Sequence, residues 1–154
     1  MTKQQAERQN TPSMEDYLKT IAMLRNENKV ARVSQISQKL KVKMPSVTSA
    51  LKKLSDKKLV LHQKYGYIEL TARGDKVAKD VIRRHEALSH FFTEILDIER
   101  ETVEADACKI EHVISQLSLE RITKFIEFIE ACPPGETKFS KKYKYYLEHG
   151  EYPE

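Results

Sequence analysis

One segment, residues 34–70, restricts the fold of this chain more than any other. Ser34 is a suitable cap for a short helix over 35–40, and after a tight three-residue connection Pro45 lies in the first turn of a second helix. Two β-prone runs follow at 59–63 and 67–70, and the turn between them contains a glycine. This order predicts a winged helix-turn-helix domain, in which the hairpin is the wing.

The rest of the chain is predicted to be helical, apart from a short β-prone stretch at 30–33. Apolar residues recur at helical spacing over 13–28, 71–96, 101–116, 118–131 and 138–148, with Ser13 and Thr71 as caps. The fold class is therefore mainly α. We place a winged domain at residues 1–72 and an all-helical domain for dimerisation and metal binding at 73–154.

Charge divides the chain in the same way. Residues 1–75 hold 15 basic and 7 acidic side chains, a net +8, whereas residues 76–154 hold 12 and 16, a net −4. A basic first half suggests a polyanionic partner such as double-stranded DNA. No apolar run approaches the roughly 20 residues of a membrane span. Residues 1–10 are polar without a signal core, so we expect a cytoplasmic protein whose two cysteines are free thiols.

A candidate metal centre lies within residues 106–115. Cys108, Glu111 and His112 stand at i, i+3 and i+4, so a helix would place a thiolate, a carboxylate and an imidazole on one face. Such a set can bind a divalent metal. The alternative is a small buried cysteine beside an exposed Glu-His pair. The pattern is not H-E-x-x-H and gives no case for a zinc protease.

Four further residues are weaker candidates. Glu104 lies one helical turn before Cys108, and His85 lies midway along the expected long helix. Asp16 falls in the first turn of the first helix, where an acid ordinarily favours the helix dipole. It becomes a ligand only if that helix packs on the metal-binding helix. Cys132 precedes Pro133-Pro134-Gly135, a typical helix terminator, and is a weak candidate for metal binding or redox sensing.

Four motifs in order resemble one known family. These are residues 11–18 (TPSMEDYL), the segment 33–54, Arg84-His85-Glu86, and residues 107–115 (ACKIEHVIS). They are similar to the diphtheria toxin repressor/manganese transport regulator family, and the resemblance covers about residues 11 to 128. It implies a homodimeric, metal-activated transcriptional repressor of metal homeostasis genes, of the two-domain type.

The resemblance also implies a ligand set, with Asp16, His85, Cys108, Glu111 and His112 as metal ligands and Glu104 with His85 at a second site. The manganese type has acids where this chain has Lys19 and Cys108. The iron type also has a cysteine at the position of Cys108. It has Met where this chain has Asp16, an acid where this chain has Ser89, and His where this chain has Glu104. Because a thiolate is a soft ligand, the set favours Fe²⁺, with Mn²⁺ next and Zn²⁺ or Co²⁺ also possible.

In this interpretation metal fixes the spacing of two recognition helices, residues 45–54, on a palindromic operator. The expected DNA contacts are Lys41, Lys43, Pro45, Ser46, Ser49, Lys52, Lys53, Lys64 and Tyr65. An alternative is a winged-helix repressor that senses an oxidant through Cys108 and Cys132. An enzyme is not expected, since no nucleophile, paired general acid and base or glycine-rich phosphate loop accompanies the cluster.

Overall fold

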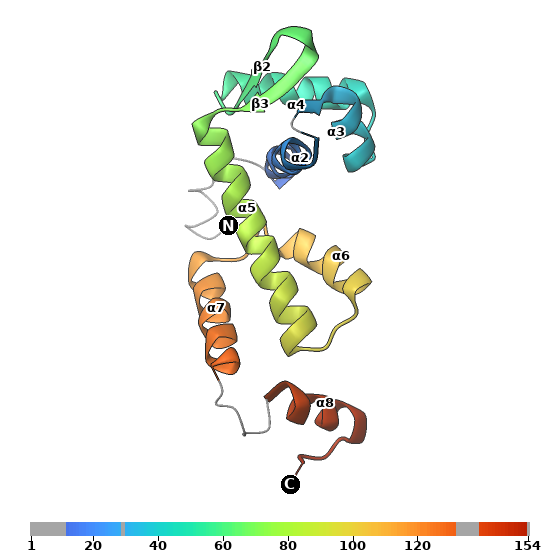
Figure 1. Ribbon diagram of the computed structural model, residues 1–154, viewed down its shortest axis with the longest axis vertical. Coiled ribbons are helices and arrows are strands. Elements are labelled where there is room, and N and C mark those ends of the chain that lie inside the picture. Colours follow the sequence, from blue (N-terminus) through green and yellow to red (C-terminus); the bar gives the residue numbers. More distant parts are fainter. Residues whose placement is uncertain (1–11, 29, 132–138, 154) are drawn as a thin grey trace. The chain divides into compact units, whose positions relative to one another are not determined.

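The computed structural model describes residues 12–28, 30–131 and 139–153. The chain forms two compact units, Met1–Ile82 and Arg83–Glu154, and the division between them falls inside helix α5 (Ala72–His90). The first unit holds helices α2 to α4 and a small sheet (Figure 1). The second holds the end of α5 and helices α6 to α8.

Three helices build the core of the first unit: α2 (Pro12–Asn28), α3 (Val33–Leu40) and α4 (Met44–Asp56). Each turns an apolar stripe inward at helical spacing, and burying one Leu or Ile side chain is worth roughly 1.5–3 kcal/mol. The fully buried side chains of these helices are Leu18, Ile21, Ile36, Val47, Leu51 and Leu54. The predicted helix-turn-helix is confirmed.

The turn between α3 and α4 is tight because Lys41 adopts a left-handed conformation, with φ 55° and ψ 38°. Its N–H group and that of Val42 bond the last carbonyls of α3, which ends the helix. Lys43 is extended, and Pro45 lies in the first turn of α4, where its missing N–H costs no hydrogen bond.

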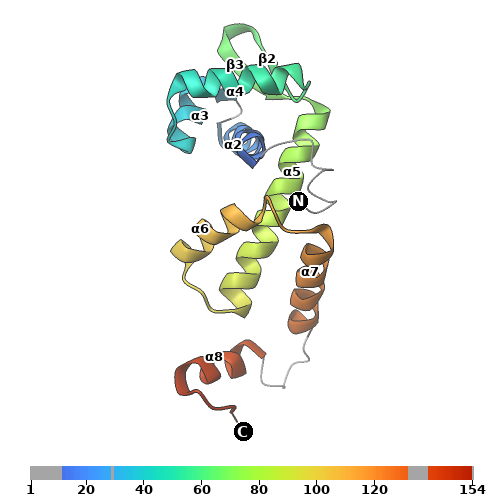
Figure 2. The same cartoon turned by 180° about the vertical axis from the view of Figure 1, so that it is seen from behind.

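An antiparallel sheet of three strands completes this unit. Strands β1 (Ala31–Arg32), β2 (Val60–His62) and β3 (Tyr67–Leu70) pair in the order β1-β3-β2, and α4 packs against β2 (Figure 2). The β2–β3 hairpin closes through a short turn, Lys64–Gly66. The wing is therefore confirmed, although β1 is only two residues long.

Two of the predicted helix caps are wrong. Ser13 and Ser34 lie inside α2 and α3, since these helices begin at Pro12 and Val33. Arg32 is the cap residue of α3, and its N–H group donates to the side-chain oxygen of Gln35 at 3.0 Å. A glutamine three residues into the helix supplies the hydrogen bond without a serine at the cap.

Thr71, in contrast, caps α5 as predicted. Its hydroxyl accepts from the N–H group of Gly74 at 3.1 Å and donates to the carbonyl of Lys58 at 2.8 Å. The backbone of Leu59 lies so close that a Cβ atom on Gly74 would stand 2.0 Å from its carbonyl oxygen. Gly74 is thus required because two backbones approach closely at this position. Its small helix-propensity cost in a first helical turn gives no sign of this requirement.

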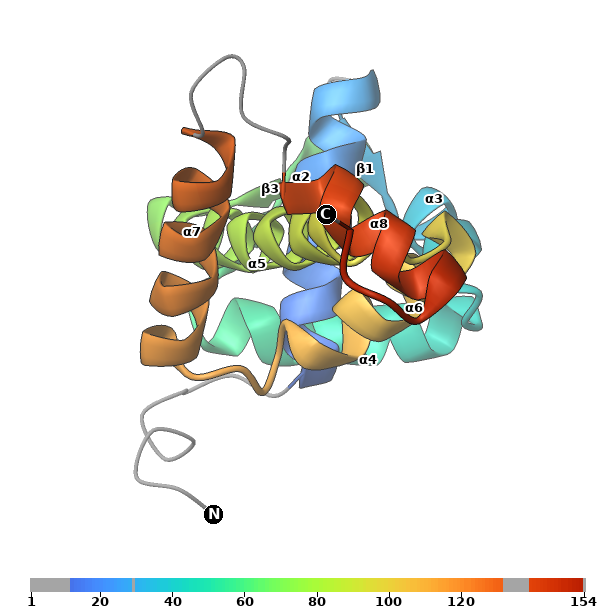
Figure 3. The same ribbon diagram turned by 90° about the horizontal axis from the view of Figure 1, so that it is seen from below.

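The second unit is built around the last turns of α5. Helices α6 (Arg100–Ile110) and α7 (Gln116–Glu130) lie on opposite sides of α5 (Figure 3), and α8 (Phe139–His149) follows. Its buried apolar side chains are Leu88, Ile95, Val103, Ala107, Leu119 and Ile126. Among the residues described, no helix is long and apolar enough to cross a membrane.

Two helix boundaries in this unit differ from the prediction. The α-helix expected to reach Leu96 ends at His90 and continues as a π-helical turn, Phe91–Ile95, in which the N–H of Leu96 bonds the carbonyl of Phe91. The helix expected over 101–116 ends at Ile110. Ser115 is extended and accepts the N–H of Ser118, so it starts α7 and prevents α6 from continuing.

We expect Gly74→Ala to destabilise the protein by about 1–3 kcal/mol, because the new Cβ must push two backbones apart. Helix propensity alone predicts the opposite sign, a gain of about 1 kcal/mol. Urea unfolding measures the difference, with Lys76→Ala on the same helix as the control. A more stable Gly74→Ala protein would contradict the close approach.

An ion-pair network joins α2 to the start of α5. The hydrogen bond from Lys79 at 2.7 Å, aided by Arg25 at 2.9 Å, lowers the pKa of Asp75 below its ordinary value. A lowered carboxyl pKa adds stability that is present above the unfolded-state pKa and is lost as the pH falls through the folded-state pKa. We expect Asp75→Asn to lower the melting temperature at pH 7, and this loss to shrink below about pH 4. A loss that is unchanged at acid pH would contradict the ion-pair origin.

Candidate metal centre and nucleic-acid interface

Glu111 and His85 form the centre of the candidate metal site. Glu111 has an exposed fraction of 0%, and its Oε2 lies 2.6 Å from Nδ1 of His85. The His85 side chain is 16% exposed. An isolated carboxylate is costly to bury, and the adjacent imidazole lowers that cost.

Cys108 joins this pair. One ligand atom each from His85, Cys108 and Glu111 lies within 4.8 Å of the other two. Although α6 ends at Ile110, Glu111 keeps a helical backbone and its N–H still bonds the carbonyl of Ala107 at 2.9 Å. The helical spacing between Cys108 and Glu111 therefore survives, and the two side chains converge as the sequence predicts.

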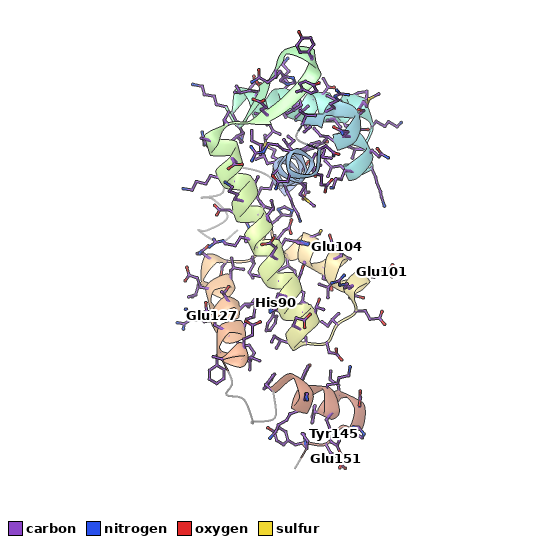
Figure 4. The ribbon with its side chains drawn as sticks, viewed as in Figure 1. His90, Glu101, Glu104, Glu127, Tyr145 and Glu151 are labelled. Atoms are coloured by element: carbon purple, nitrogen blue, oxygen red, sulfur yellow. The ribbon has the colours of Figure 1, made fainter. Side chains whose placement is uncertain are left out.

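His112 and Glu104 lie next to the same group. Nε2 of the buried His112 is 3.5 Å from Oε1 of Glu111. Glu104, which projects from α6 in Figure 4, is 69% exposed and reaches Nε2 of His85 at 3.3 Å. The Cys108 thiol lies 3.6 Å from the other oxygen of Glu104. His85 thus has a carboxylate at each of its ring nitrogens.

The residues of this cluster fit a divalent transition metal. Imidazole nitrogen, thiolate sulfur and carboxylate oxygen are its usual ligands, and a cation would neutralise the buried charge of Glu111. Five of the predicted ligands are brought together: His85, Glu104, Cys108, Glu111 and His112. Asp16 is on α2 in the first unit, where its metal role stays a prediction. Cys132 lies outside the described residues.

A shallow hollow of about 600 Å³ opens beside His85 and Glu104, between α5 and α6. It is lined also by Ser89, whose buried hydroxyl has no hydrogen-bond partner among the residues described. The sequence analysis singled out Ser89 only as a departure from the iron-type pattern. Its position in this hollow depends on how α6 folds back along α5, a tertiary contact that no local pattern indicates.

The candidate nucleic-acid interface lies on α4, the turn before it and the wing. The predicted DNA contacts with described side chains are all exposed to solvent: Lys41, Lys43, Pro45, Ser46, Ser49, Lys52, Lys53 and Tyr65. The side chain of Lys64 lies outside the described part. Because the apolar stripe of α4 faces the core, its exposed side carries mainly small polar and basic groups, with Met44 at its first turn, which suits a helix in the major groove.

Sequence reasoning missed one basic residue here. The guanidinium of Arg32 lies 5.0 Å from the ring centroid of Tyr67 and donates to its hydroxyl at 3.1 Å. The pairing of β1 with β3 sets Arg32 opposite Tyr67, at the end of β3 that follows the turn of the wing. A single arginine in a short β-prone stretch gives no sequence signal for this contact, since the signal lies in the strand register.

Comparison with known proteins also separates a DNA-binding part of the chain from a metal-binding part. Residues 9–68 match the family model described as "Iron dependent repressor, N-terminal DNA binding domain". Residues 71–140 match the model "Iron dependent repressor, metal binding and dimerisation domain". The two matches together span most of the chain.

Individual relatives are transcriptional regulators. The chain is 39% identical over 120 residues to the "HTH-type transcriptional regulator MntR" of Bacillus pumilus, covering 78% of this chain and 83% of that protein. The protein of the same name from Bacillus subtilis is 38% identical, covering 78% and 84%. The solved structure "Structure of the manganese regulator SloR" superposes with a TM-score of 0.69 at 32% identity, covering 84% of this chain and 60% of that chain.

The chain spans less than two thirds of SloR, so only the shared part supports the likeness. The resemblance noted from four sequence motifs is therefore confirmed, and so is the expectation that the protein is not an enzyme, because the matched family consists of regulators. On these grounds the chain belongs to the iron-dependent repressor family, that of the diphtheria toxin repressor and the manganese transport regulator, whose members are metal-dependent transcriptional regulators.

Proposed function

We propose that this chain is a cytoplasmic, metal-activated repressor that binds palindromic operator DNA as a homodimer and controls genes of metal homeostasis. The observation that carries the proposal is the convergence of His85, Cys108 and Glu111 within the unit that matches a metal-binding and dimerisation domain. The other unit presents a basic helix-turn-helix and wing. DNA recognition and metal sensing therefore have separate residues in one chain.

The metal would be held by His85, Cys108, Glu111 and His112, with Asp16 as a further ligand from α2. When bound, the metal supplies positive charge that several donors share. Glu104, with the second ring nitrogen of His85, would serve a second site beside the hollow that Ser89 lines. The role of Asp16 is what would couple metal to DNA, because α2 belongs to the DNA-binding unit.

We propose Fe²⁺ as the activating metal, with Mn²⁺ next and Zn²⁺ or Co²⁺ as further possibilities. The reason is the thiol of Cys108, because a soft sulfur ligand favours the later first-row metals over Mn²⁺. The names of the relatives point to manganese, as in the manganese regulator SloR. Selectivity must therefore be measured, since affinity alone does not decide which metal a site holds in cells.

On DNA, Ser46, Ser49 and Lys52 are proposed to contact bases in the major groove. Lys41, Lys43, Lys53 and Lys64 are proposed to contact phosphates, with Tyr65 on the wing. A second copy of the chain would cover part of the second unit. Large apolar side chains exposed on or near α7 support this: Val113, Leu117, Phe125 and Phe128.

We expect Glu111→Gln to weaken metal binding by at least about tenfold, because the buried charge that attracts the cation is removed. Anaerobic titration with Fe²⁺ and Mn²⁺ measures this affinity. In parallel, random DNA duplexes are enriched on the protein with each metal or with a chelator. Wild type should enrich a palindrome only with metal, and Glu111→Gln should not.

Asp106→Asn is the matched control, an exposed acid on the same helix that should leave both measurements unchanged. Equal enrichment of one palindrome in metal and in chelator would exclude metal activation. Peroxide would then be tested on the wild type, since a repressor that senses an oxidant through its cysteines would lead.

We expect Lys53→Gln to weaken binding to all DNA sequences and to reduce the slope of log affinity against log salt by about 1, as the loss of one phosphate contact requires. Fluorescence anisotropy at several salt concentrations measures the slope. Lys124→Gln on α7 removes the same charge far from the proposed interface in sequence and should leave the slope unchanged. A slope change of equal size in both variants would argue against a specific interface.

A further inference from the structure

The tip of the wing holds a tyrosine in an unusual environment. Tyr65 is 91% exposed, so its ring makes almost no contact with the rest of its own fold. The hairpin around it is well formed, since the N–H of Gln63 bonds the carbonyl of Tyr67 at 2.9 Å and the Gln63 amide donates to Glu69 at 2.7 Å. One large aromatic side chain at the turn of this hairpin thus faces the solvent. Figure 1 shows the path of the hairpin itself.

The backbone of Tyr65 is also strained. Its φ of 71° and ψ of 17° lie in the left-handed region, which glycine adopts freely but a bulky residue adopts at a cost. The next residue, Gly66, takes φ 75° without that cost. A turn selected only for closure would have Asn or Gly at position 65 as well. The tyrosine therefore lowers the stability of the free protein, and burial of its ring within the fold does not offset this loss.

We infer that Tyr65 anchors the wing in the minor groove of DNA, where its ring packs against deoxyribose beside the site that α4 occupies. This inference rests on the proposed DNA-binding function and gives Tyr65 a contact different from a phosphate. A tyrosine hydroxyl can donate to a phosphate, but a lysine or a short polar side chain would supply that contact without an exposed aromatic ring. An exposed ring gains most from apolar sugar surface, as in other minor-groove contacts made by apolar side chains.

The arrangement of the first unit supports the choice of groove. Strand β2 packs against α4, so the hairpin leaves the body next to the recognition helix. With α4 in the major groove, a neighbouring element that passes the phosphate backbone meets the adjacent minor groove. Arg32, held against the ring of Tyr67, places a cation beside the wing, where it can meet that backbone.

The inference predicts opposite effects on folding and on binding. We expect Tyr65→Asn to raise the melting temperature by about 3–6 °C, because asparagine tolerates the left-handed region. The same variant should bind DNA about tenfold more weakly. Tyr65→Phe keeps the ring and the strain, so its melting temperature and affinity should stay close to those of the wild type. Lys58, with φ 58°, offers a control for strain relief alone through Lys58→Asn.

The experiment uses the full-length protein, loaded with metal, and the duplex that the wild type enriches from random DNA. Hydroxyl-radical cleavage reports deoxyribose in the minor groove, and methylation of guanine N7 reports the major groove. Tyr65→Asn should lose sugar protection at the flanks of the site and keep the guanine protection, whereas Tyr65→Phe should keep both.

Three contrary outcomes are distinguishable. If the wild type enriches and protects no duplex under any metal condition, the proposed function fails and this inference fails with it. If the wild type binds, but Tyr65→Asn has the same affinity and the same sugar protection, the minor-groove anchor alone is excluded. Loss of affinity in Tyr65→Phe equal to that in Tyr65→Asn would also overturn it, since the hydroxyl and not the ring would then make the contact.

Discussion

The packing of the second unit depends on one carboxylate that is buried away from water. Glu111 is fully buried beside the imidazoles of His85 and His112, at 2.6 Å and 3.5 Å. Such a group must be compensated by donors or by a cation, and each of its neighbours can serve a metal equally well. The contact fixes the end of α6 against α5, so the fold of this unit and its capacity for metal depend on the same interaction.

The first unit has the complementary property, because its chemistry lies on the surface. Its core is wholly apolar along α4, and the polar and basic side chains of that helix are left exposed. A surface of this kind needs no ligand to be stable, and it can meet DNA without rearranging. In the proposed function, control of this surface comes from the other unit, which contains the buried charge.

Sequence reasoning succeeded where local pattern decides structure. The helix-turn-helix, the wing and the Thr71 cap follow from apolar spacing, glycine and hydroxyl side chains. It failed at helix boundaries where more than one residue could form the capping hydrogen bond. At the start of α3, the side chain of Gln35 accepts the N–H of the cap residue Arg32, and Ser34 is not the cap. After α6, Ser115 begins the next helix before residue 116, where the predicted helix was expected to end. The requirement for Gly74 and the contact of Arg32 with Tyr67 arise from strand and backbone approaches that no short pattern encodes.

The candidate metal centre shows why an inexact helix prediction can still identify side chains that converge. Cys108, Glu111 and His112 were placed on one face of a helix that in fact ends at Ile110. The convergence survived because Glu111 retains helical dihedral angles and its bond to Ala107. What spacing could not supply was His85, which comes from 23 residues before Cys108 in sequence and reaches both Glu111 and Glu104. In a site formed by two helices, sequence spacing identifies the side chains that share one helix. The side chain from the other helix is brought to them only by the tertiary structure.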